Sequence, residues 1–348
     1  MNATTVDFVT HALELSGEEG KETSFSMARE AKDFVSRGLY GVLVVAGTLG
    51  NMLTVLVLHS KEFAAGNYRL LLSTLAVADT GVLLTELLKV WLAKVNYSLL
   101  VKLLLSSSKS CIILYMVSFF MKHLAACILM LFTLERAICI TMPLRGKQLC
   151  TGRRIRIALA VAVVWAFTVN SYLMFYVKRV IKRSGSKIVK VSCVYADIWD
   201  VMEIVDACLS SFVPSSVIFI GNCIVIGRLV LSQRGLQVSQ SRKSSSTTAT
   251  LLMVSFTYLL LTLPRSVYHI GRAHGLWSVD FTGDRAKYDN FYLTYTCVTF
   301  FYYINNAINF WLYCLSGSKF RRGLKAMILP SALVKKKDTS VVTVSSLV

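Results

Sequence analysis

The chain has 348 residues, of which 55% are hydrophobic and only 16% are charged. A soluble domain carries about a quarter charged residues, so this composition indicates a protein that lies largely in lipid and argues against a soluble enzyme or a disordered chain. The 38 lysine and arginine residues outnumber the 19 aspartate and glutamate residues. In so apolar a chain, we expect this excess to face membrane lipid head groups and expect no nucleic acid as a partner.

Seven apolar stretches follow one another along the chain, and a helix needs about 20 such residues to cross a bilayer. They span residues 39–58, 70–88, 111–134, 157–177, 207–227, 249–270 and 290–318. Because backbone polar groups in lipid must be bonded within the chain, each stretch is expected to be a helix. The predicted fold is therefore an all-α membrane protein with a bundle of seven transmembrane helices.

Seven spans place the two termini on opposite sides of the membrane. We expect residues 1–37 to form an extracellular N-terminal segment and residues 38–316 to form the bundle. Residues 317–348 are expected to form a short amphipathic helix followed by a cytoplasmic tail.

The distribution of basic residues favours an N-terminus outside the cell, but only slightly. In this orientation the inner loops hold 18 lysine and arginine residues and the outer loops hold 16, of which six lie in residues 178–190. Asn2 and Asn96 each begin a glycosylation acceptor tripeptide, and both would lie outside.

Charged side chains within or beside the apolar stretches are functional candidates, because a charge inside a membrane helix costs about 2.5–3.5 kcal/mol. They are Asp79, Glu86, Lys89, Lys122, Glu203, Asp206 and Arg265. Glu86 and Lys89 share a helix face and could neutralise each other, whereas Glu203 and Asp206 fall near a span end, where solvation is the simpler interpretation. Lys122 and Arg265 have no acidic neighbour on their own helix. They require a partner from another helix, such as Glu86 for Lys122, or a ligand.

Short motifs in a fixed order resemble those of the rhodopsin-like (class A) G-protein-coupled receptors. They are Gly50-Asn51, Leu75-Ala76-Val77-Ala78-Asp79, Cys111, Glu135-Arg136-Ala137, Trp165, Pro214, Pro264 and Asn309-Phe310-Trp311-Leu312-Tyr313. The resemblance rests on their joint order and spacing, including the 25 residues between Cys111 and Arg136. The pattern from Asn305 to Tyr313 is most similar to invertebrate neuropeptide receptors, and molluscan chemosensory receptors are a second resemblance.

The resemblance implies a multi-pass protein of the plasma membrane that activates a heterotrimeric G protein. It implies a disulfide between Cys111 and Cys193, which would join the third span to the second outer loop. It also implies an activation switch in which Glu135 holds Arg136 at rest and Arg136 moves toward the G protein on activation. Asn309 and Tyr313 would belong to the same switch.

A buried polar cluster is implied as well, similar to the one that binds sodium in many resting receptors. Its members are Asn51, Asp79, Asn305 and Asn309. Carboxylate and amide oxygens suit a hard cation, but Ala125 stands where the family usually has a serine. A hydrogen-bond network with water is therefore an equal alternative for this cluster. We expect no other metal site and no cofactor.

Four residues depart from the family pattern in the activation region. Phe310 replaces the usual proline of the seventh span, Asn222 replaces a tyrosine of the fifth, and Tyr258 and Thr262 replace a phenylalanine and a tryptophan of the sixth. Without the proline, we expect a weaker kink in the seventh helix. The activation relay is expected to be altered.

The predicted ligand site lies in the outer halves of four spans. The position of the amine-binding aspartate is occupied by Ser118 and that of the retinal-binding lysine by Tyr303, so neither an amine ligand nor a Schiff base is expected. Residues 178–193 carry apolar residues on both sides of a Ser-Gly-Ser turn, which predicts a hairpin that resembles the lid of peptide receptors. Its six basic residues would steer an acidic ligand or bind the acidic N-terminal segment. The predicted ligand-binding residues are Glu86, Lys89, Ser118, Lys122, Arg265, His269 and Tyr303.

The C-terminal part carries three weaker signals. An interfacial amphipathic helix is predicted from one apolar face, formed by Phe320, Leu324, Met327 and Ile328. The Ser/Thr runs at 244–248 and 339–346 could take phosphate and bind arrestin, although solvated loop is the simpler interpretation of each. The end Ser346-Leu347-Val348 weakly resembles a ligand of PDZ proteins.

The leading interpretation is a receptor for an extracellular ligand, expected to be a neuropeptide. A chemosensory receptor for a small molecule is the alternative. A seven-span transporter that uses the internal charges as a relay is the third interpretation, but the chain lacks the internal repeats typical of transporters. The chain carries no Walker loop, HExxH or paired cysteine–histidine spacing, so we expect no enzymatic activity.

Overall fold

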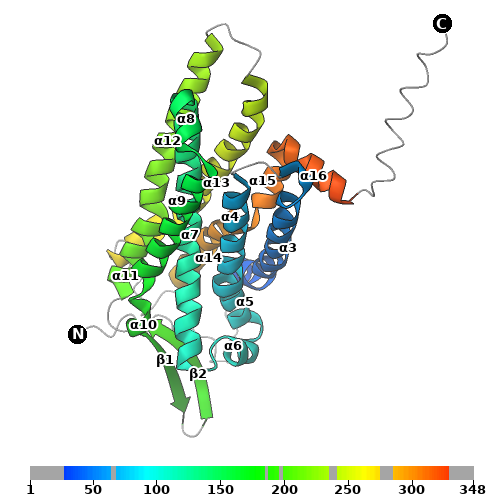
Figure 1. Ribbon diagram of the computed structural model, residues 1–348. Helices are drawn as coiled ribbons and strands as arrows, with labels where there is room; N and C mark the ends of the chain where they lie inside the picture. Colours follow the sequence, from blue (N-terminus) through cyan, green and yellow to red (C-terminus); the bar gives the residue numbers. More distant parts are fainter. Residues whose placement is uncertain are drawn as a thin grey trace, which may run out of the picture.

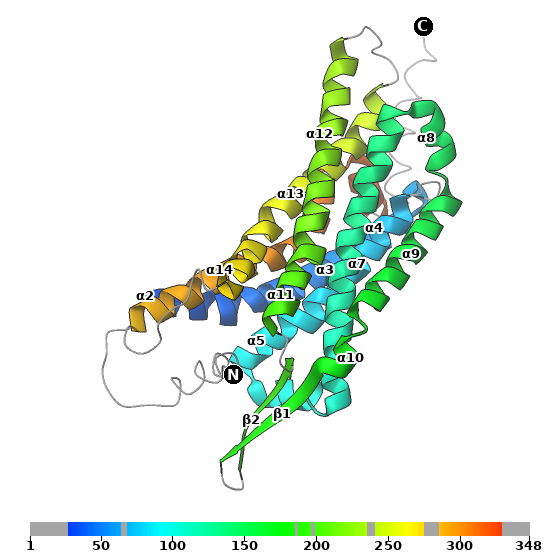
Figure 2. The same ribbon diagram turned by 90° about the vertical axis from the view of Figure 1, so that its left-hand side faces the viewer.

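The computed structural model describes residues 27–63, 68–184, 187–195, 199–234, 241–274 and 285–328, which form an elongated bundle of long helices (Figure 1, Figure 2). Within this part of the chain, six helical stretches are long and apolar enough to cross a membrane. Helices α14 and α15 occupy the seventh apolar stretch of the sequence. The predicted all-α bundle of seven transmembrane helices is confirmed.

The seven spans are built from the following helices. The first comprises α2 (Met27–Asp33), η1 (Phe34–Leu39) and α3 (Tyr40–Leu58), and the second comprises α4 (Tyr68–Val82), η3 (Leu83–Leu87) and α5 (Leu88–Val95). The third is α7 (Ser108–Thr141), and the fourth is α9 (Gly152–Asn170) with α10 (Leu173–Tyr176). The fifth comprises α11 (Trp199–Ala207), η4 (Cys208–Phe212) and α12 (Val213–Arg234). The sixth is α13 (Ser241–Ala273), and the seventh is α14 (Arg285–Ala307) with α15 (Asn309–Ser316).

Short elements connect the spans, namely η2 (Lys61–Phe63), α6 (Tyr97–Leu103), α8 (Pro143–Leu149) and the strands β1 (Val177–Ser184) and β2 (Lys187–Tyr195). The helix α16 (Ser318–Ile328) follows the last span. We call the end of the bundle that carries the two strands the hairpin end, and the opposite end, where α7 carries Arg136, the arginine end (Figure 1).

The first helix extends beyond the predicted bundle boundary. Helices α2 and η1 continue it back to Met27, within the stretch assigned above to the N-terminal segment. Lys32 Nζ lies 3.2 Å from Asp289 Oδ1 on α14, so an ion pair ties this extension to the seventh span. Hydropathy alone does not indicate such a helix, because its residues are good helix formers without being apolar.

Three spans contain a π-helical segment, namely η1, η3 and η4. Such segments are rare and occur frequently at functional sites, where they change the direction of nearby side chains. Segment η3 contains Glu86, and η4 begins two residues after Asp206. Two of the charged candidates are therefore positioned by irregular helix geometry.

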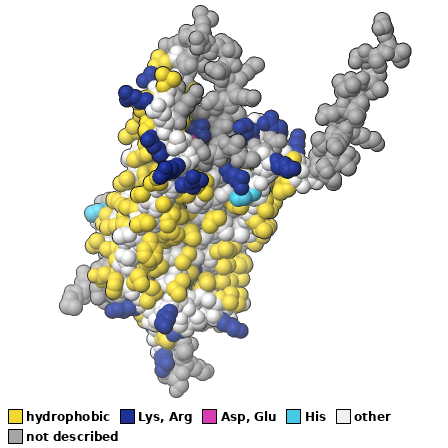
Figure 3. Space-filling model, viewed as in Figure 1, with side chains coloured by type: hydrophobic (Ala, Val, Ile, Leu, Met, Phe, Trp, Pro, Cys, Tyr) yellow, Lys and Arg dark blue, Asp and Glu magenta, His cyan; other side chains and the backbone are white. Residues whose placement is uncertain are grey.

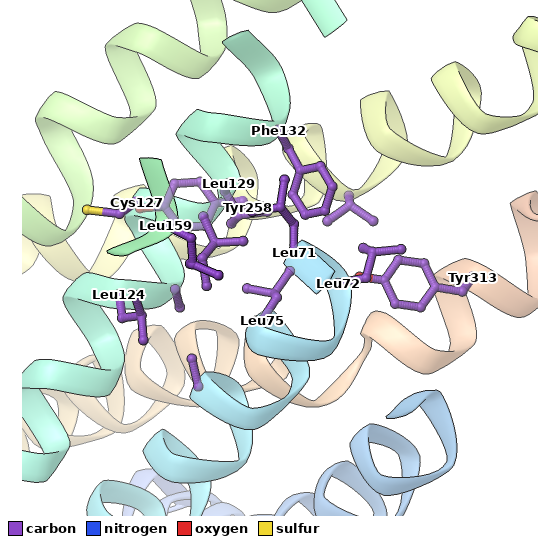
Figure 4. Packing of buried hydrophobic residues seen from close by; sticks show 14 of the residues in the cluster. Leu71, Leu72, Leu75, Leu124, Cys127, Leu129, Phe132, Leu159, Tyr258 and Tyr313 are labelled. Carbon is purple, nitrogen blue, oxygen red and sulfur yellow. The ribbon is translucent and has the colours of Figure 1, made fainter. Parts of the chain in front are cut away.

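The core is centred on α7. Figure 4 shows Leu124 and Leu129 of α7 packing in one cluster with Leu71 and Leu75 of α4 and Leu159 of α9. Many large apolar side chains remain exposed on the outside of the bundle. They form the yellow zone of Figure 3, with lysine and arginine side chains above and below it. This apolar exterior suits a protein surrounded by lipid.

The seventh span is interrupted at Ile308 although it lacks the usual proline. Two side chains bond helix carbonyls in the turn before it, since Asn306 donates to the carbonyl of Tyr302 at 3.2 Å and Asn51 donates to the carbonyl of Asn306 at 3.0 Å, and such bonds compete with the backbone ladder. Phe310 itself packs against Gly50 of α3, where an added Cβ would lie 3.1 Å from the Cβ of Phe310. A small residue at Gly50 is therefore what permits the aromatic ring at this position.

The hairpin predicted in the second outer loop is confirmed. Strands β1 and β2 pair in antiparallel fashion, with Ile181 opposite Val191. Cys193 on β2 forms a disulfide with Cys111 on α7, and the hydroxyl of Tyr115 donates to the carbonyl of Cys193 at 3.1 Å. These bonds fix the hairpin on the outer turns of the third span.

The helix α16 follows the seventh span and confirms the expected short amphipathic helix. Its Phe320 ring is buried, and its centroid lies 5.8 Å from that of Phe310 and 5.6 Å from that of Tyr313. Met327 and Ile328, farther along, are exposed. The apolar face thus packs on the bundle at one end and is available to lipid at the other.

Candidate functional site

A buried ion-pair network in the half of the third span nearer the hairpin end is the most chemically distinctive part of the bundle. The Nζ of Lys122 lies 2.7 Å from an Asp206 carboxylate oxygen and 3.8 Å from Glu86 Oε1. The Lys122 side chain is only 4% exposed. It also lies over the Phe119 ring, 3.9 Å from the centroid, which adds a cation–π contact. The second, third and fifth spans are thereby joined through one ammonium group.

Asp206 is the member whose placement sequence reasoning left open. Its location near a span end left solvation as an even alternative, and the same held for Glu203. The structure favours the other alternative, because helix α11 begins at Trp199 and carries the two carboxylates into the bundle. The exposed fraction of the side chain is 17% for Asp206 and 13% for Glu203.

His123 extends the network toward the fourth span. Its Nε2 lies 3.5 Å from Asp206 Oδ1, and its Nδ1 lies 3.0 Å from the side-chain amide of Asn170. The ring of Trp165 packs edge-on against it, with centroids 6.1 Å apart. The sequence signal was a histidine next to Lys122 inside an apolar run, but the site prediction did not include it.

Arg265 of the sixth span faces aromatic rings of the seventh. Its guanidinium lies 4.3 Å from the centroid of the Tyr302 ring, and the buried Tyr303 ring lies beside Tyr302, with centroids 5.2 Å apart. Its Nε is shielded from solvent and has no hydrogen-bond partner in the described part of the chain. The partner that Arg265 requires is therefore mainly an aromatic surface, and one donor is left for another group.

The remaining predicted ligand residues do not gather at Lys122. His269 Nδ1 lies 3.4 Å from Glu203 Oε2, and the same carboxylate binds Arg272, which forms a second ionic group between α11 and α13. Lys89 lies over the Tyr115 ring, 4.4 Å from the centroid. Ser118 is buried and donates to the carbonyl of Leu114 in its own helix.

The predicted polar cluster is buried, and the structure links two of its members directly. Asn309 donates its side-chain amide to Asp79 Oδ2 at 2.7 Å. Asn51 donates to the backbone carbonyl of Asn306 at 3.0 Å, and Asn305 is also buried. Among the described residues, no group of three or more His, Cys, Asp and Glu side chains lies close enough together to hold a metal ion.

At the arginine end, Arg136 lines a small cavity of about 20 Å³ between the third, fifth and sixth spans. Its Nη2 lies 3.8 Å from Glu135 Oε2. Asn222 of α12 and Ser255 of α13, which also line the cavity, are joined by hydrogen bonds of 2.9 and 3.1 Å. Sequence reasoning noted Asn222 only as a departure from the family, and its pairing with Ser255 was not foreseen.

The modification sites are described only in part. Asn96 is exposed and caps α6, where its side-chain oxygen accepts from the backbone amide of Leu99 at 3.0 Å. Asn2, the tail at 339–346 and the C-terminal tripeptide lie outside the described residues, and so do the side chains of 244–248.

Comparisons with known proteins agree with this architecture. The family described as "7 transmembrane receptor (rhodopsin family)" matches residues 50–313. The FMRFamide peptide receptor frpr-18 of Caenorhabditis elegans is 25% identical over 152 residues, which cover 42% of this chain and 34% of that protein. The alignment thus spans about a third of the relative's length. The family match covers most of the chain and all the motifs from Gly50 to Tyr313, and we conclude that this multi-pass membrane protein belongs to the rhodopsin family of seven-transmembrane receptors.

Proposed function

We propose that the protein is a plasma-membrane receptor, with its N-terminus outside the cell, that binds an extracellular neuropeptide and activates a heterotrimeric G protein. The similarity to a peptide receptor supports the class of ligand. The hairpin end would then face the extracellular space, where a disulfide such as Cys111–Cys193 is stable.

The buried network around Lys122 is the observation that carries the proposal. It places two carboxylates around the ammonium group of Lys122, so a peptide with groups of both signs could exchange partners with it. A ligand group that competes for Asp206 or Glu86 would release Lys122 from one of its neighbouring helices. Such a ligand would bind more tightly to the helix arrangement in which Lys122 is released. This difference in affinity between the two arrangements is what shifts the conformational equilibrium.

At the arginine end, the described conformation is closed. A cavity of about 20 Å³ holds roughly one water molecule and admits no segment of a partner protein. Activation would require the inner ends of α12 and α13 to separate from α7, which exposes Arg136 to the G protein. The Glu135–Arg136 pair and the Asn222–Ser255 pair both favour the closed arrangement.

The polar cluster is proposed to bind sodium in this closed state. Asn51 Oδ1 is a buried acceptor without a hydrogen-bond partner in the described part of the chain. Asp79 brings a buried carboxylate, and such oxygens fit a hard cation. Arrestin and PDZ proteins remain predicted partners, which no observation on the described residues supports.

The proposal is tested by expressing the receptor in cells with a G-protein dissociation reporter and applying a neuropeptide library. We expect at least one peptide to give a saturable, concentration-dependent response. The variant Arg136→Gln should bind that peptide but not dissociate the G protein. Ion or proton flux on addition of a substrate, without G-protein activation, would contradict the receptor proposal and favour a transporter.

A test of orientation is independent of the ligand. Epitope tags at the two ends should be accessible from opposite faces of intact cells, with the N-terminal tag outside. Accessibility of both tags from one face would rule out the proposed topology.

A further inference from the structure

A second cavity at the arginine end has the chemistry of an anion-binding site. It measures about 270 Å³, far more than the cavity beside Arg136. It lies where the end of α3 meets the first turns of α4 and α9, and it is lined by His59, Arg69, Leu70, Ser73, Gly152, Ile155 and Arg156.

The N-termini of two helices meet at this cavity. The positive ends of the α4 and α9 dipoles therefore lie beside the same space, and the Arg154 amide is capped by the Thr151 hydroxyl. Neither helix has an acidic residue in its first turn. Arginines occupy these turns instead, so cations stand at helix ends that already carry positive potential. A bound anion would relieve this repulsion.

The polar groups in the cavity are available to a ligand. In the part of the chain that the structure describes, neither Arg69 nor Arg156 forms an ion pair. The Ser73 hydroxyl is shielded from solvent and has no hydrogen-bond partner there. His59 donates Nδ1–H to the carbonyl of Val55 at 2.8 Å, which leaves Nε2 for another group.

The charge distribution of the whole chain favours an anion on this side. With the arginine end facing the cytoplasm, the inner segments (60–69, 141–156, 228–247 and 315–348) hold 18 basic residues and only two acidic ones, Glu62 and Asp338. The outer segments hold 16 basic and 12 acidic residues. The excess of positive charge is therefore concentrated where anionic lipids of the cytoplasmic leaflet lie.

We propose that this cavity binds the phosphorylated headgroup of a phosphoinositide in the cytoplasmic leaflet. Arg69 and Arg156 donate to the phosphate oxygens, together with the amides at the start of α9 and the Ser73 hydroxyl. The acyl chains extend toward the membrane centre along exposed apolar residues of the same helices, namely Leu56, Leu70 and Ile157. Several positive groups around one space favour an inositol phosphate over the single net charge of phosphatidylserine. The inference rests on the orientation proposed above.

The decisive comparison removes two positive charges either from the lining of the cavity or from exposed positions close to it. Purified full-length receptor in detergent is titrated with a fluorescent phosphatidylinositol bisphosphate. Arg69→Gln/Arg156→Gln should weaken binding about thirtyfold, since each variant residue loses a direct hydrogen bond to phosphate and each such bond contributes about 1 kcal/mol. The matched control is Arg153→Gln/Arg154→Gln, because both side chains are exposed in the first turn of α9 and neither lines the cavity. The control removes the same charge without a direct contact to the phosphate and should weaken binding clearly less, and equal losses in the two variants would overturn the proposal.

Further arms distinguish the source of the phosphate. Free inositol trisphosphate and inorganic phosphate should compete only weakly, because the acyl chains contribute to binding. If free inositol phosphate competes as strongly as the lipid does, the ligand of the cavity is a soluble anion. That outcome would contradict the proposal.

If Arg69→Gln/Arg156→Gln does not fold, the unaltered receptor still decides the matter. In nanodiscs that contain phosphatidylserine and phosphoinositide, native mass spectrometry should show preferential retention of the phosphoinositide, and equal retention refutes the site. None of these measurements uses a peptide or a G protein, so they can succeed or fail independently of the proposed function.

Discussion

Lys122 and Asp206, which are 84 residues apart in sequence, lie 2.7 Å apart in the interior of the bundle. A charge pair removed from water is costly to form, and breaking it by deleting one partner leaves an uncompensated charge. The pair therefore constrains how far the fifth span can move from the third while Lys122 remains bound.

The first prediction compares the stability of the two single variants of this pair with that of the double variant. Lys122→Met alone and Asp206→Asn alone should each destabilise the protein by about 3–5 kcal/mol, seen as a lower melting temperature of purified receptor and reduced surface expression. The double variant should recover part of the loss, because Asp206 is then no longer left without a cation, whereas Glu86 still loses Lys122. Stability of Lys122→Met equal to the original protein would show that the pair does not hold the bundle.

The second prediction concerns the disulfide between Cys111 and Cys193. It closes a loop with a sequence separation of 82 residues, so its removal should cost about 4–5 kcal/mol by chain entropy. Cys111→Ser should lower the melting temperature and free the hairpin, measured by proteolysis between β1 and β2. Cys223→Ser is the matched control, since Cys223 is free and exposed. If both variants melt alike, the covalent link contributes nothing measurable.

The third prediction tests sodium at the polar cluster. Replacing sodium chloride by choline chloride at constant ionic strength should lower the melting temperature of the original protein. Asp79→Asn should abolish this dependence, because the substitution removes the carboxylate charge but keeps a similar shape. A melting temperature that does not respond to sodium in the original protein would favour a water-filled network instead.

The fourth prediction concerns the hydrogen bonds between Asn222 of α12 and Ser255 of α13, beside the cavity that Arg136 lines. Asn222→Ala or Ser255→Ala should raise G-protein activation in the absence of ligand, since each bond contributes about 1 kcal/mol to the closed arrangement. The control is Ser216→Ala on the same helix as Asn222, where the hydroxyl only donates to the carbonyl of Phe212 at 2.9 Å. Unchanged basal activity in both interface variants would mean that this pair does not restrain opening.

Hydropathy was sufficient to predict the spans because lipid imposes one requirement on every residue that it contacts. It was not sufficient to place Asp206 or Glu203, because the fifth apolar run begins at Ala207 and the helix that carries them begins earlier, at Trp199. Sequence reasoning correctly required a partner for Lys122 from another helix. It named Glu86, and the structure adds Asp206, which lies closer.

The interruption at Ile308 shows the same limit from another side. The weaker kink expected without the proline stays a prediction, but the seventh span is interrupted at Ile308. In the turn before it, Asn51 of the first span donates to the carbonyl of Asn306. This contact depends on packing between helices and is not encoded in the local pattern.

The hairpin has one more consequence for how fast a ligand could reach the interior. Val177, the first residue of β1, directly follows α10 and is paired with Tyr195 at the end of β2. The hairpin is therefore held at its start by the fourth span and near its end by the disulfide to the third. If a ligand enters from this side, as proposed, it has to pass a hairpin that is restrained at both ends, and we expect bulkier molecules to associate more slowly.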